Sequence, residues 1–233
     1  MNCVHLVVGP TGAGKTDVAT EIAGERDAPI VVADRIQCYL DLPVTSARLD
    51  GGPHRHHLAA RTVPDGDYPV HEAAYALLRK VEHLSQVHDH VVVEGGSISL
   101  LRRFADCRGR MPFRLTATVL PLADERAHLD RLRARAARMI ADGMLDEIAK
   151  AWQHQEQRAF VASVNGPETV LAWCTETGFD PEDLPGIHED DSAELAERIA
   201  LVHHEHSLEQ HEVFTRLFGW NHERPGSGDR SRV

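Results

Sequence analysis

The residue pattern with the clearest chemical meaning lies near the N-terminus. Residues 9–16 read Gly-Pro-Thr-Gly-Ala-Gly-Lys-Thr and match the phosphate-binding pattern G-x-x-x-x-G-K-[ST]. Glycines let backbone N–H groups converge on phosphate oxygens, and a helix N-terminus adds a positive dipole end. Lys15 is expected to reach the terminal phosphates, and the Thr16 hydroxyl to hold a magnesium ion. Because an apolar run precedes the pattern and helical spacing follows it, we predict a phosphate cradle at 9–16 and not a chance glycine turn.

An aspartate at the end of a predicted strand is the next candidate. Asp34 directly follows the apolar run 29–33. Ligands of open parallel sheets bind outside the carboxyl ends of the strands, so we expect Asp34 beside the cradle. There it could bind magnesium through water, accept a proton from a nucleophile, or simply cap a helix or form a salt bridge. The guanine-reading pattern N-K-x-D is absent from the sequence, so ATPases and kinases stay open at this point.

The elements that must position these residues follow from the spacing of apolar side chains. Continuous apolar runs predict strands over 3–8, 29–33, 90–94 and 114–120. Helical spacing predicts helices over 17–23, 71–87, 124–142, 144–157, 167–177 and 192–218, with another helix start after Gly95-Gly96-Ser97. Continuous apolar strands that alternate with helices indicate a parallel sheet covered on both faces. Residues 41–70, rich in Pro, Gly, His and Arg, are predicted to form long loops over an active face.

The fold class that follows is α/β: a P-loop NTPase-like parallel sheet flanked by helices, with a helical C-terminal portion. We divide the chain into a P-loop α/β core over 1–122 and a mainly helical portion over 123–222 packed on that core. The polar tail over 223–233 is expected to be disordered.

Composition narrows the classes of partner. The 233 residues carry a formal net charge of -11, so a long nucleic acid would be repelled unless basic residues gathered on one face, and we expect no nucleic-acid partner. No apolar run approaches the roughly 20 residues that span a bilayer. The four cysteines are widely spaced, without the pairs typical of zinc sites. We therefore expect a cytoplasmic protein with reduced thiols and no membrane partner.

Two predicted helices carry further candidates. Arg131, Arg135 and Arg138 recur at i, i+4 and i+7 and share one face, which is either a solvated surface or a phosphate clamp. On the last helix an apolar stripe runs through Leu195, Ile199, Val202, His206, Val213 and Leu217. This stripe places His206 on the inward face, where a histidine bonded to a backbone carbonyl is the ordinary interpretation.

Four segments together resemble a known family. The cradle, Asp34-Arg-Ile-Gln-Cys38, Ser46-Ala-Arg48 and Glu94-Gly-Gly-Ser-Ile-Ser-Leu-Leu101 are similar to the bacterial isopentenyltransferases. These are the adenylate dimethylallyltransferases that make cytokinins, and they are related to the tRNA dimethylallyltransferases. The resemblance is clear over the first half of the chain and looser over the helical half. The cradle is shared with the tRNA branch, whereas the second and fourth segments look like the small, AMP-using branch.

The resemblance implies transfer of a five-carbon prenyl group to N6 of AMP, which gives a cytokinin nucleotide and diphosphate. The donor is dimethylallyl diphosphate or its hydroxylated analogue, 1-hydroxy-2-methyl-2-butenyl 4-diphosphate. The cradle then binds the leaving diphosphate and not ATP. By resemblance, the diphosphate-binding residues are Gly12, Ala13, Gly14, Lys15, Thr16 and Arg135, with Mg²⁺ at Thr16. The catalytic residues are Asp34, which accepts the N6 proton, Thr11, close to the reacting groups, and Lys15, while Ser46 helps to hold the adenine.

The sequence also departs from the family pattern. Where the family has an acidic D-x-D-G segment in its nucleotide and donor pocket, this chain has Ser163-Val-Asn165-Gly, and we expect Ser163 and Asn165 to bind the nucleotide there. By resemblance, His206 lies near the donor's hydroxyl and selects the hydroxylated donor. Two other classes stay open: a small-molecule kinase in which Asp34 activates a hydroxyl for ATP, and a non-catalytic nucleotide-binding protein.

Overall fold

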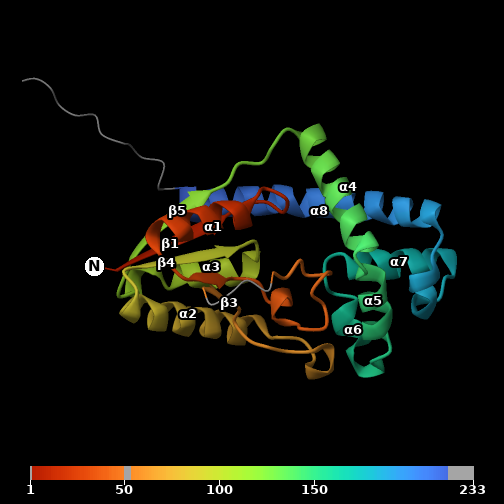
Figure 1. The fold of residues 1–233 in the computed structure, drawn as a ribbon, viewed down its shortest axis with the longest axis horizontal. Coiled ribbons are helices and arrows are strands. Elements are labelled where there is room, and N and C mark those ends of the chain that lie inside the picture. The colour runs from red at the N-terminus through yellow and green to blue at the C-terminus, as the bar shows by residue number, and fades with distance from the viewer. Residues whose placement is uncertain (1, 50–53, 220–233) are drawn as a thin grey trace, which may run out of the picture.

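The computed structural model describes residues 2–49 and 54–219, and their strands form one parallel sheet (Figure 1). Its spatial order is β3 (Arg55–His56), β2 (Ile30–Val32), β4 (His90–Gly95), β1 (Cys3–Val8) and β5 (Arg114–Val119), and all neighbouring strands run parallel. The four predicted strands are therefore confirmed. β3 is a correction, because it lies within the segment 41–70 for which the sequence predicts loops. Its two polar residues form no apolar run that could reveal a strand.

Side chains that alternate between two covered faces explain the continuous apolar sequence of the central strands. Val7 of β1 packs in one cluster with Ala19 of α1 (Lys15–Arg26). Its neighbours Leu6 and Val8 belong to the larger cluster on the opposite face, which also contains Leu77 of α2 (Val70–Val87). Burying such an aliphatic side chain fully stabilises the fold by about 1.5–3 kcal/mol. The polar exception within β1 is His5, whose ring nitrogens form hydrogen bonds with the hydroxyls of Thr116 (2.8 Å) and Thr118 (3.0 Å) on β5.

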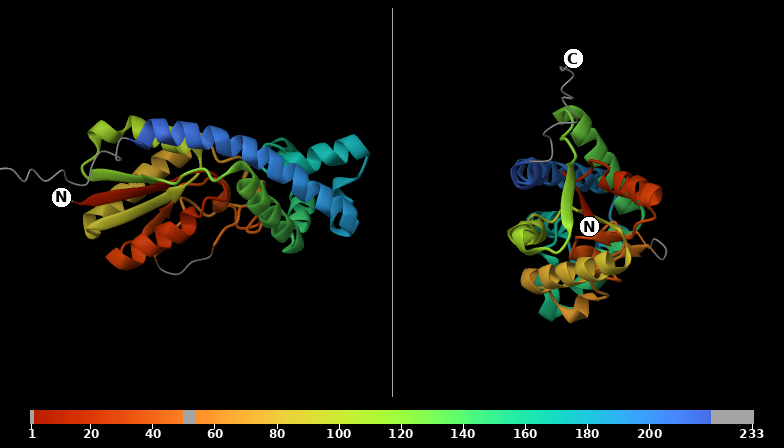
Figure 2. Two further views of the ribbon diagram at one scale, coloured as in Figure 1. Left: turned by 90° about the horizontal axis from the view of Figure 1, so that it is seen from above. Right: turned by 90° about the vertical axis from the view of Figure 1, so that its left-hand side faces the viewer.

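Three helices complete the layers. In the right-hand view of Figure 2, α1 (red) lies on one face of the sheet. The helices α3 (Ile98–Asp106, yellow-green) and α8 (Glu189–Phe218, blue) lie on the other. The helix α8 contacts both α3 and β5. The carboxyl ends of β1, β2 and β4 thus meet at one edge of the sheet, with α1 on one face and α3 and α8 on the other.

The second half of the chain is helical, with α4 (Glu125–Ala141), α5 (Met144–Trp152), α6 (Arg158–Val161) and α7 (Pro167–Thr177) preceding α8. Figure 1 shows α8, in blue, running from α7 past α4 and back along the sheet. One helix therefore contacts both the helical half and the sheet. The boundary at 122/123 stays a prediction, and the tail 223–233 lies outside the described residues.

In the second half of the chain, two helices differ from the sequence prediction by three or more residues at one end. The helix predicted over 144–157 ends at Trp152, because the carbonyl of Trp152 accepts a hydrogen bond from Arg158 Nε (2.8 Å) in place of a helical amide. Short turns, including α6, follow. The helix predicted over 192–218 begins earlier, at Glu189. Three acidic residues occupy its first turn, where negative charge is favourable at the positive end of the helix dipole.

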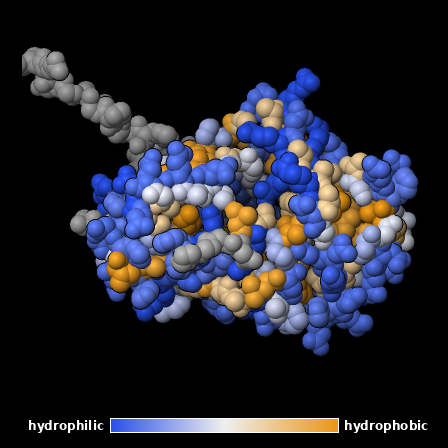
Figure 3. Space-filling model, in the orientation of Figure 1, coloured by the Kyte–Doolittle hydropathy of each residue, from blue (hydrophilic) through white to orange (hydrophobic). Residues whose placement is uncertain are grey.

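The surface is polar over most of the view in Figure 3, where hydrophobic residues occur in separate small groups. Within residues 2–49 and 54–219, no helix combines the length and the apolar character that crossing a bilayer requires.

Candidate active site

The cradle 9–16 connects β1 to α1 at the carboxyl edge of the sheet, as predicted. Gly12 and Gly14 have φ angles of 76° and 81°, which L side chains rarely adopt. Gly14 is the N-cap of α1, so no side chain competes for the amides of the first helical turn. Those amides and the dipole of a 12-residue helix point at the place where a phosphate would lie.

Lys15 is folded back over the cradle. Its Nζ donates hydrogen bonds to the carbonyls of Gly9 (3.0 Å) and Pro10 (2.7 Å). Burial, and after it the positive charge of Arg135, lower the pKa of Lys15 to about 8, although the nearby carboxylates of Glu94 and Asp34 oppose the shift. A bound anion would therefore stabilise an ammonium group whose burial is costly without one.

Only one arginine of the predicted stripe on α4 reaches this site. Arg131 and Arg138 are exposed, whereas Arg135 is half-buried and its Nε is buried with no hydrogen-bond partner among the described residues. Burial lowers the pKa of Arg135, the charge of Arg138 lowers it too, and Asp34 opposes them. The geometry therefore separates Arg135 from the two arginines that share its helical face.

Asp34 follows β2, and its carboxylate caps the 3₁₀ turn Ile36–Cys38. Its Oδ1 accepts hydrogen bonds from the amides of Ile36 (2.8 Å) and Gln37 (3.4 Å). Burial raises the pKa of Asp34, and these two hydrogen bonds and the charge of Lys15 only partly offset the shift. Both hydrogen bonds use Oδ1, which leaves Oδ2 for a ligand. Asp34 is thus a capping residue and also a candidate base, two interpretations that the sequence treats as alternatives.

Thr11 is held by a residue that the sequence does not single out. Its backbone N–H and its Oγ1 both donate to Oε1 of Gln210 on α8, at 2.8 and 3.2 Å. The Nε2 of Gln210 donates to the carbonyl of Gly96 (2.7 Å), and the residue is 3% exposed. In the sequence, Gln210 is one glutamine on the last helix. Without the fold, it cannot be distinguished from a glutamine on the surface.

The loop after β4 approaches the cradle closely because it contains no side chain there. A Cβ on Gly95 would lie 2.5 Å from the carbonyl oxygen of Ala33, and one on Gly96 would lie 3.4 Å from Lys15 Nζ. Glu94, just before them, forms an ion pair with Arg55 of β3, and both side chains are buried. The last carboxylate of β4 is therefore neutralised within the protein.

The predicted nucleotide-binding residues lie on two segments outside the cradle. Ser46 Oγ donates to the carbonyl of Leu42 (2.7 Å) in its own turn. Ser163 and Asn165 are exposed on the turn between α6 and α7, where Ser163 Oγ donates to the carbonyl of Phe160 (2.7 Å). Both serine hydroxyls donate their hydrogen atom to a backbone carbonyl and so do not donate to a ligand. Each oxygen keeps lone pairs that can accept a hydrogen bond from one.

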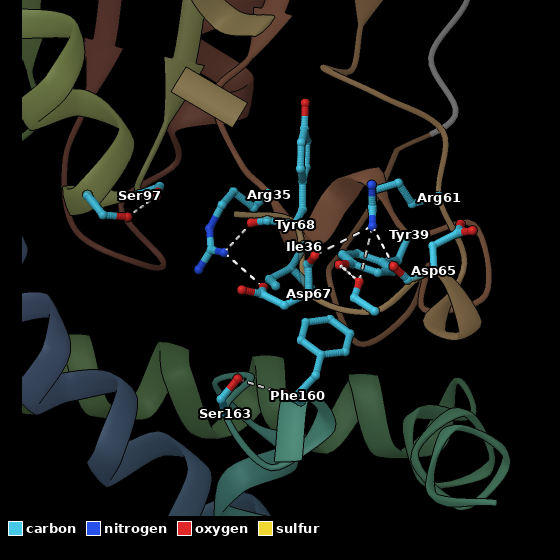
Figure 4. Close-up of polar contacts among 12 residues, drawn as sticks. Arg35, Ile36, Tyr39, Arg61, Asp65, Asp67, Tyr68, Ser97, Phe160 and Ser163 are labelled. Carbon is cyan, nitrogen blue, oxygen red and sulfur yellow. Dashed lines mark hydrogen bonds and ion pairs between the residues drawn. The ribbon is translucent and has the colours of Figure 1, made fainter. Parts of the chain in front are cut away.

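Figure 4 shows Arg35 and the turn bearing Phe160 and Ser163 on opposite sides of one space. Arg35 Nη1 donates to Asp67 Oδ1 (3.0 Å) and to the carbonyl of Tyr68 (2.5 Å). The ring of Tyr39 packs against the ring of Phe160, with centroids 4.9 Å apart. The Tyr39–Phe160 contact joins the segment after Asp34 to the helical half of the chain.

The inward face of α8 differs from the apolar stripe predicted for it. Val202 is 38% exposed, and the His206 side chain is 31% exposed with its Nδ1 3.7 Å from Glu209 Oε2. Ser207 and Gln210 are buried on this helix, and burial, with the charge of Arg135 as a smaller cause, lowers the pKa of His203 to about 4. The predicted stripe is confirmed for Leu195, Ile199 and Val213, which are buried, and it is wrong for Val202, which is exposed.

The Thr16 hydroxyl fits the magnesium ion that the resemblance implies. Magnesium typically takes one or two protein ligands and completes its shell with phosphate oxygens and water. Thr16 stands in the first turn of α1, beside the expected position of the phosphates. No group of three or more histidine, cysteine or acidic side chains suited to a metal occurs in the described part of the chain. The donor set therefore suits a metal that arrives with a diphosphate.

Comparisons with known proteins agree with this geometry. The chain is 38% identical over 229 residues to an adenylate dimethylallyltransferase of Rhodococcoides fascians, covering 93% of this chain and 89% of that protein. It is 31% identical over 225 residues to an adenylate dimethylallyltransferase of Agrobacterium tumefaciens strain T37, covering 91% of this chain and 90% of the relative.

Solved structures support the fold at lower sequence identity. A tRNA isopentenylpyrophosphate transferase of Bacillus halodurans superposes with a TM-score of 0.72 at 12% identity, over 91% of this chain and 86% of that one. A tRNA isopentenylpyrophosphate transferase of Staphylococcus epidermidis gives a TM-score of 0.70, also at 12% identity, over 94% and 91% of the two chains. The model of the isopentenyl transferase family matches residues 2–224, and the chain therefore belongs to that family.

Proposed function

We propose that this protein is a prenyltransferase that moves a five-carbon group from dimethylallyl diphosphate, or its hydroxylated analogue, to N6 of AMP. The observation that carries the proposal is the pairing of Lys15 and Arg135, two partly buried cations that both interact with the charge of Asp34. Two cations in one cradle suit a diphosphate, and the carboxylate beside them suits a proton acceptor. The adenylate dimethylallyltransferases that the chain resembles support AMP as the acceptor.

Cleavage of the donor depends on stabilising its leaving group. The bond between C1 of the allyl group and the diphosphate oxygen breaks, and negative charge develops on the diphosphate. Lys15, Arg135 and the amides at the start of α1 are in place before this charge appears, so little reorganisation is needed during the reaction. Mg²⁺ held at Thr16 would supply further neutralisation of the same oxygens.

Attack by the acceptor depends on positioning and on proton removal. The N6 amine of adenine is a weak nucleophile because its lone pair is delocalised into the ring. As the N6–C1 bond forms, one N6 proton passes to Oδ2 of Asp34, whose raised pKa makes the carboxylate a stronger base. Prenylated AMP, diphosphate and a protonated Asp34 are the products of the step.

The remaining candidate residues contact either the acceptor nucleotide or the prenyl donor. Ser46, Ser163 and Asn165 bind the nucleotide through oxygens and an amide, and His206 contacts the hydroxyl of the hydroxylated donor. These assignments rest on the family resemblance and on the placement of Ser163 across from Arg35 (Figure 4). They define a site for a free nucleotide in a protein of net charge -11. We place the reaction in the cytoplasm, without nucleic acid or membrane as partner.

A turnover panel tests the proposal. AMP, ADP, ATP and a tRNA are each incubated with both five-carbon donors and Mg²⁺, and prenylated product and free diphosphate are quantified. Equal amounts of prenyl-AMP and diphosphate are expected from AMP, and excess chelator is expected to slow the reaction strongly. Formation of ADP from ATP with transfer of the phosphoryl group to a hydroxyl acceptor would identify a kinase, and AMP binding without turnover would identify a non-catalytic protein. Either result would refute the proposal.

A further inference from the structure

Gln210 connects three parts of the site that are distant in the sequence. It comes from α8, 199 residues after Thr11, and its side chain lies between the cradle and the loop after β4. The carbonyl of Gly96 must receive a donor, so Nε2 is the amide atom that faces it. The backbone N–H of Thr11 must find an acceptor, so Oε1 is the atom that faces Thr11. These two backbone partners determine the orientation of the amide without ambiguity.

The orientation of Gln210 decides what the Thr11 hydroxyl does. Oε1 only accepts hydrogen bonds, so Thr11 Oγ1, at 3.2 Å from it, must donate its single hydrogen atom there. The lone pairs of Oγ1 remain for other partners. Thr11 therefore accepts hydrogen bonds from a bound substrate and has no hydrogen atom to offer it.

Burial makes this arrangement costly to lose. Gln210 is 3% exposed, and a Cβ on Gly96 would lie 2.9 Å from its Nε2, so neither water nor a larger neighbour replaces the amide easily. Three backbone or hydroxyl groups depend on this one side chain. Removing it strands the N–H of Thr11 and the carbonyl of Gly96 in a buried position.

We propose that Gln210 is a positioning residue for prenyl transfer, which acts by fixing the cradle at Thr11 and by turning the Thr11 lone pairs towards the reacting groups. The inference rests on the proposed function, because the substrate that meets Thr11 is the acceptor amine. That amine carries two hydrogens: Asp34 takes the one that is lost, and Thr11 accepts a hydrogen bond from the one that stays.

The decisive experiment is a double-mutant cycle. Gln210→Met keeps the length of the side chain and removes its hydrogen bonds, and Thr11→Val keeps the shape of the side chain and removes the hydroxyl. Each single variant is expected to lower kcat about ten- to a hundredfold. If Gln210 acts through the Thr11 hydroxyl, adding Gln210→Met to the Thr11→Val variant should lower kcat by less than about a further threefold. Losses that multiply in the double variant would overturn the inference.

Two further measurements separate positioning from general stability. Ser207→Ala is the matched control, since Ser207 is also buried on α8 and its Oγ donates to the carbonyl of His203 in the same helix. Amide hydrogen exchange of the cradle should accelerate in Gln210→Met and stay unchanged in Ser207→Ala. Inorganic diphosphate, measured by calorimetry, should bind Gln210→Met within about threefold of the wild type. Unchanged exchange, or equal effects of both variants, would also overturn the inference.

A second variant keeps the test informative if Gln210→Met does not fold. Gln210→Glu retains an acceptor for both Thr11 groups and adds negative charge near Lys15, so KM for the donor should rise while kcat falls less than in Thr11→Val. A lower kcat than in Thr11→Val would contradict the positioning role. If the wild type does not prenylate AMP, the proposed function itself is refuted. If the wild type is active but the losses of the two variants multiply, only the inference about Gln210 is refuted.

Discussion

Lys15, which begins α1, lies close enough to Arg135 of α4 for the guanidinium to add to the lowering of the Lys15 pKa that burial causes. Two like charges therefore lie together, partly buried, at the edge of the sheet. Such an arrangement is unfavourable in the free protein and becomes favourable when a dianion binds between the cations. In the proposed function, this pair would make diphosphate binding depend on the docking of the helical half on the sheet.

Diphosphate affinity should fall as pH rises through about 8. The pKa of Lys15 lies near that value in the free protein, so above it the protein must take up a proton to bind the anion. The loss should approach about tenfold per pH unit. Calorimetric titration of inorganic diphosphate between pH 6.5 and 9.5 measures it. Lys15→Met, which has no titrating ammonium, is the control and should bind weakly with a flatter pH profile; an equally steep profile would assign the proton to another group.

Asp34→Asn should lower kcat by about 10²–10⁴-fold, the usual contribution of a general base. Asn keeps an oxygen that accepts from the amides of Ile36 and Gln37, so the fold and the affinity for AMP should change by no more than a few-fold. In the wild type, kcat/KM should fall with acidification at a pH above the usual range of an aspartate, because burial raises the pKa of Asp34. Near-normal turnover in Asp34→Asn would exclude this role.

Arg135→Ala should weaken donor binding by about ten- to a hundredfold, the range expected for a hydrogen bond between charged groups. Arg131→Ala and Arg138→Ala serve as controls on the same helical face, and both should change donor affinity by less than about twofold because their side chains are exposed. The dissociation constant of dimethylallyl diphosphate distinguishes the three variants. Similar small effects from all of them would mean a solvated stripe.

His206→Leu should selectively penalise the hydroxylated donor. A buried substrate hydroxyl without its partner costs about 1–3 kcal/mol, which is roughly ten- to a hundredfold in kcat/KM. Dimethylallyl diphosphate has no such hydroxyl and should be used at least as well. The ratio of kcat/KM for the two donors gives the result, with melting temperature as a control. An unchanged ratio would exclude His206 from donor selection.

Arg55→Met should destabilise the protein by about 3–5 kcal/mol, because it leaves the buried carboxylate of Glu94 without its partner. Adding Glu94→Gln in the same chain should restore most of the lost stability, since no uncompensated charge then stays buried. Urea denaturation of the single and double variants measures both effects. A mild single variant would show that water reaches Glu94.

Local pattern alone determined the parts of this protein that depend on short-range geometry. The glycine spacing of residues 9–16 requires the backbone turn before α1, and the continuous apolar runs at 3–8 and 90–94 require strands that are covered on both faces. The position of Asp34 at a strand end followed from the same reasoning, because parallel strands share one carboxyl edge. The four segments that resemble the family were readable without any fold.

Tertiary structure decided which members of each local pattern face the site. Helical periodicity places Arg131, Arg135 and Arg138 on one face, and only the packing of α4 buries Arg135. Gln210 meets Thr11 across 199 residues, a contact that no local signal encodes, and Val202 of the expected apolar stripe is exposed. Spacing fixes which residues share a face, but the burial of that face depends on distant segments, whose docking is a property of the whole chain.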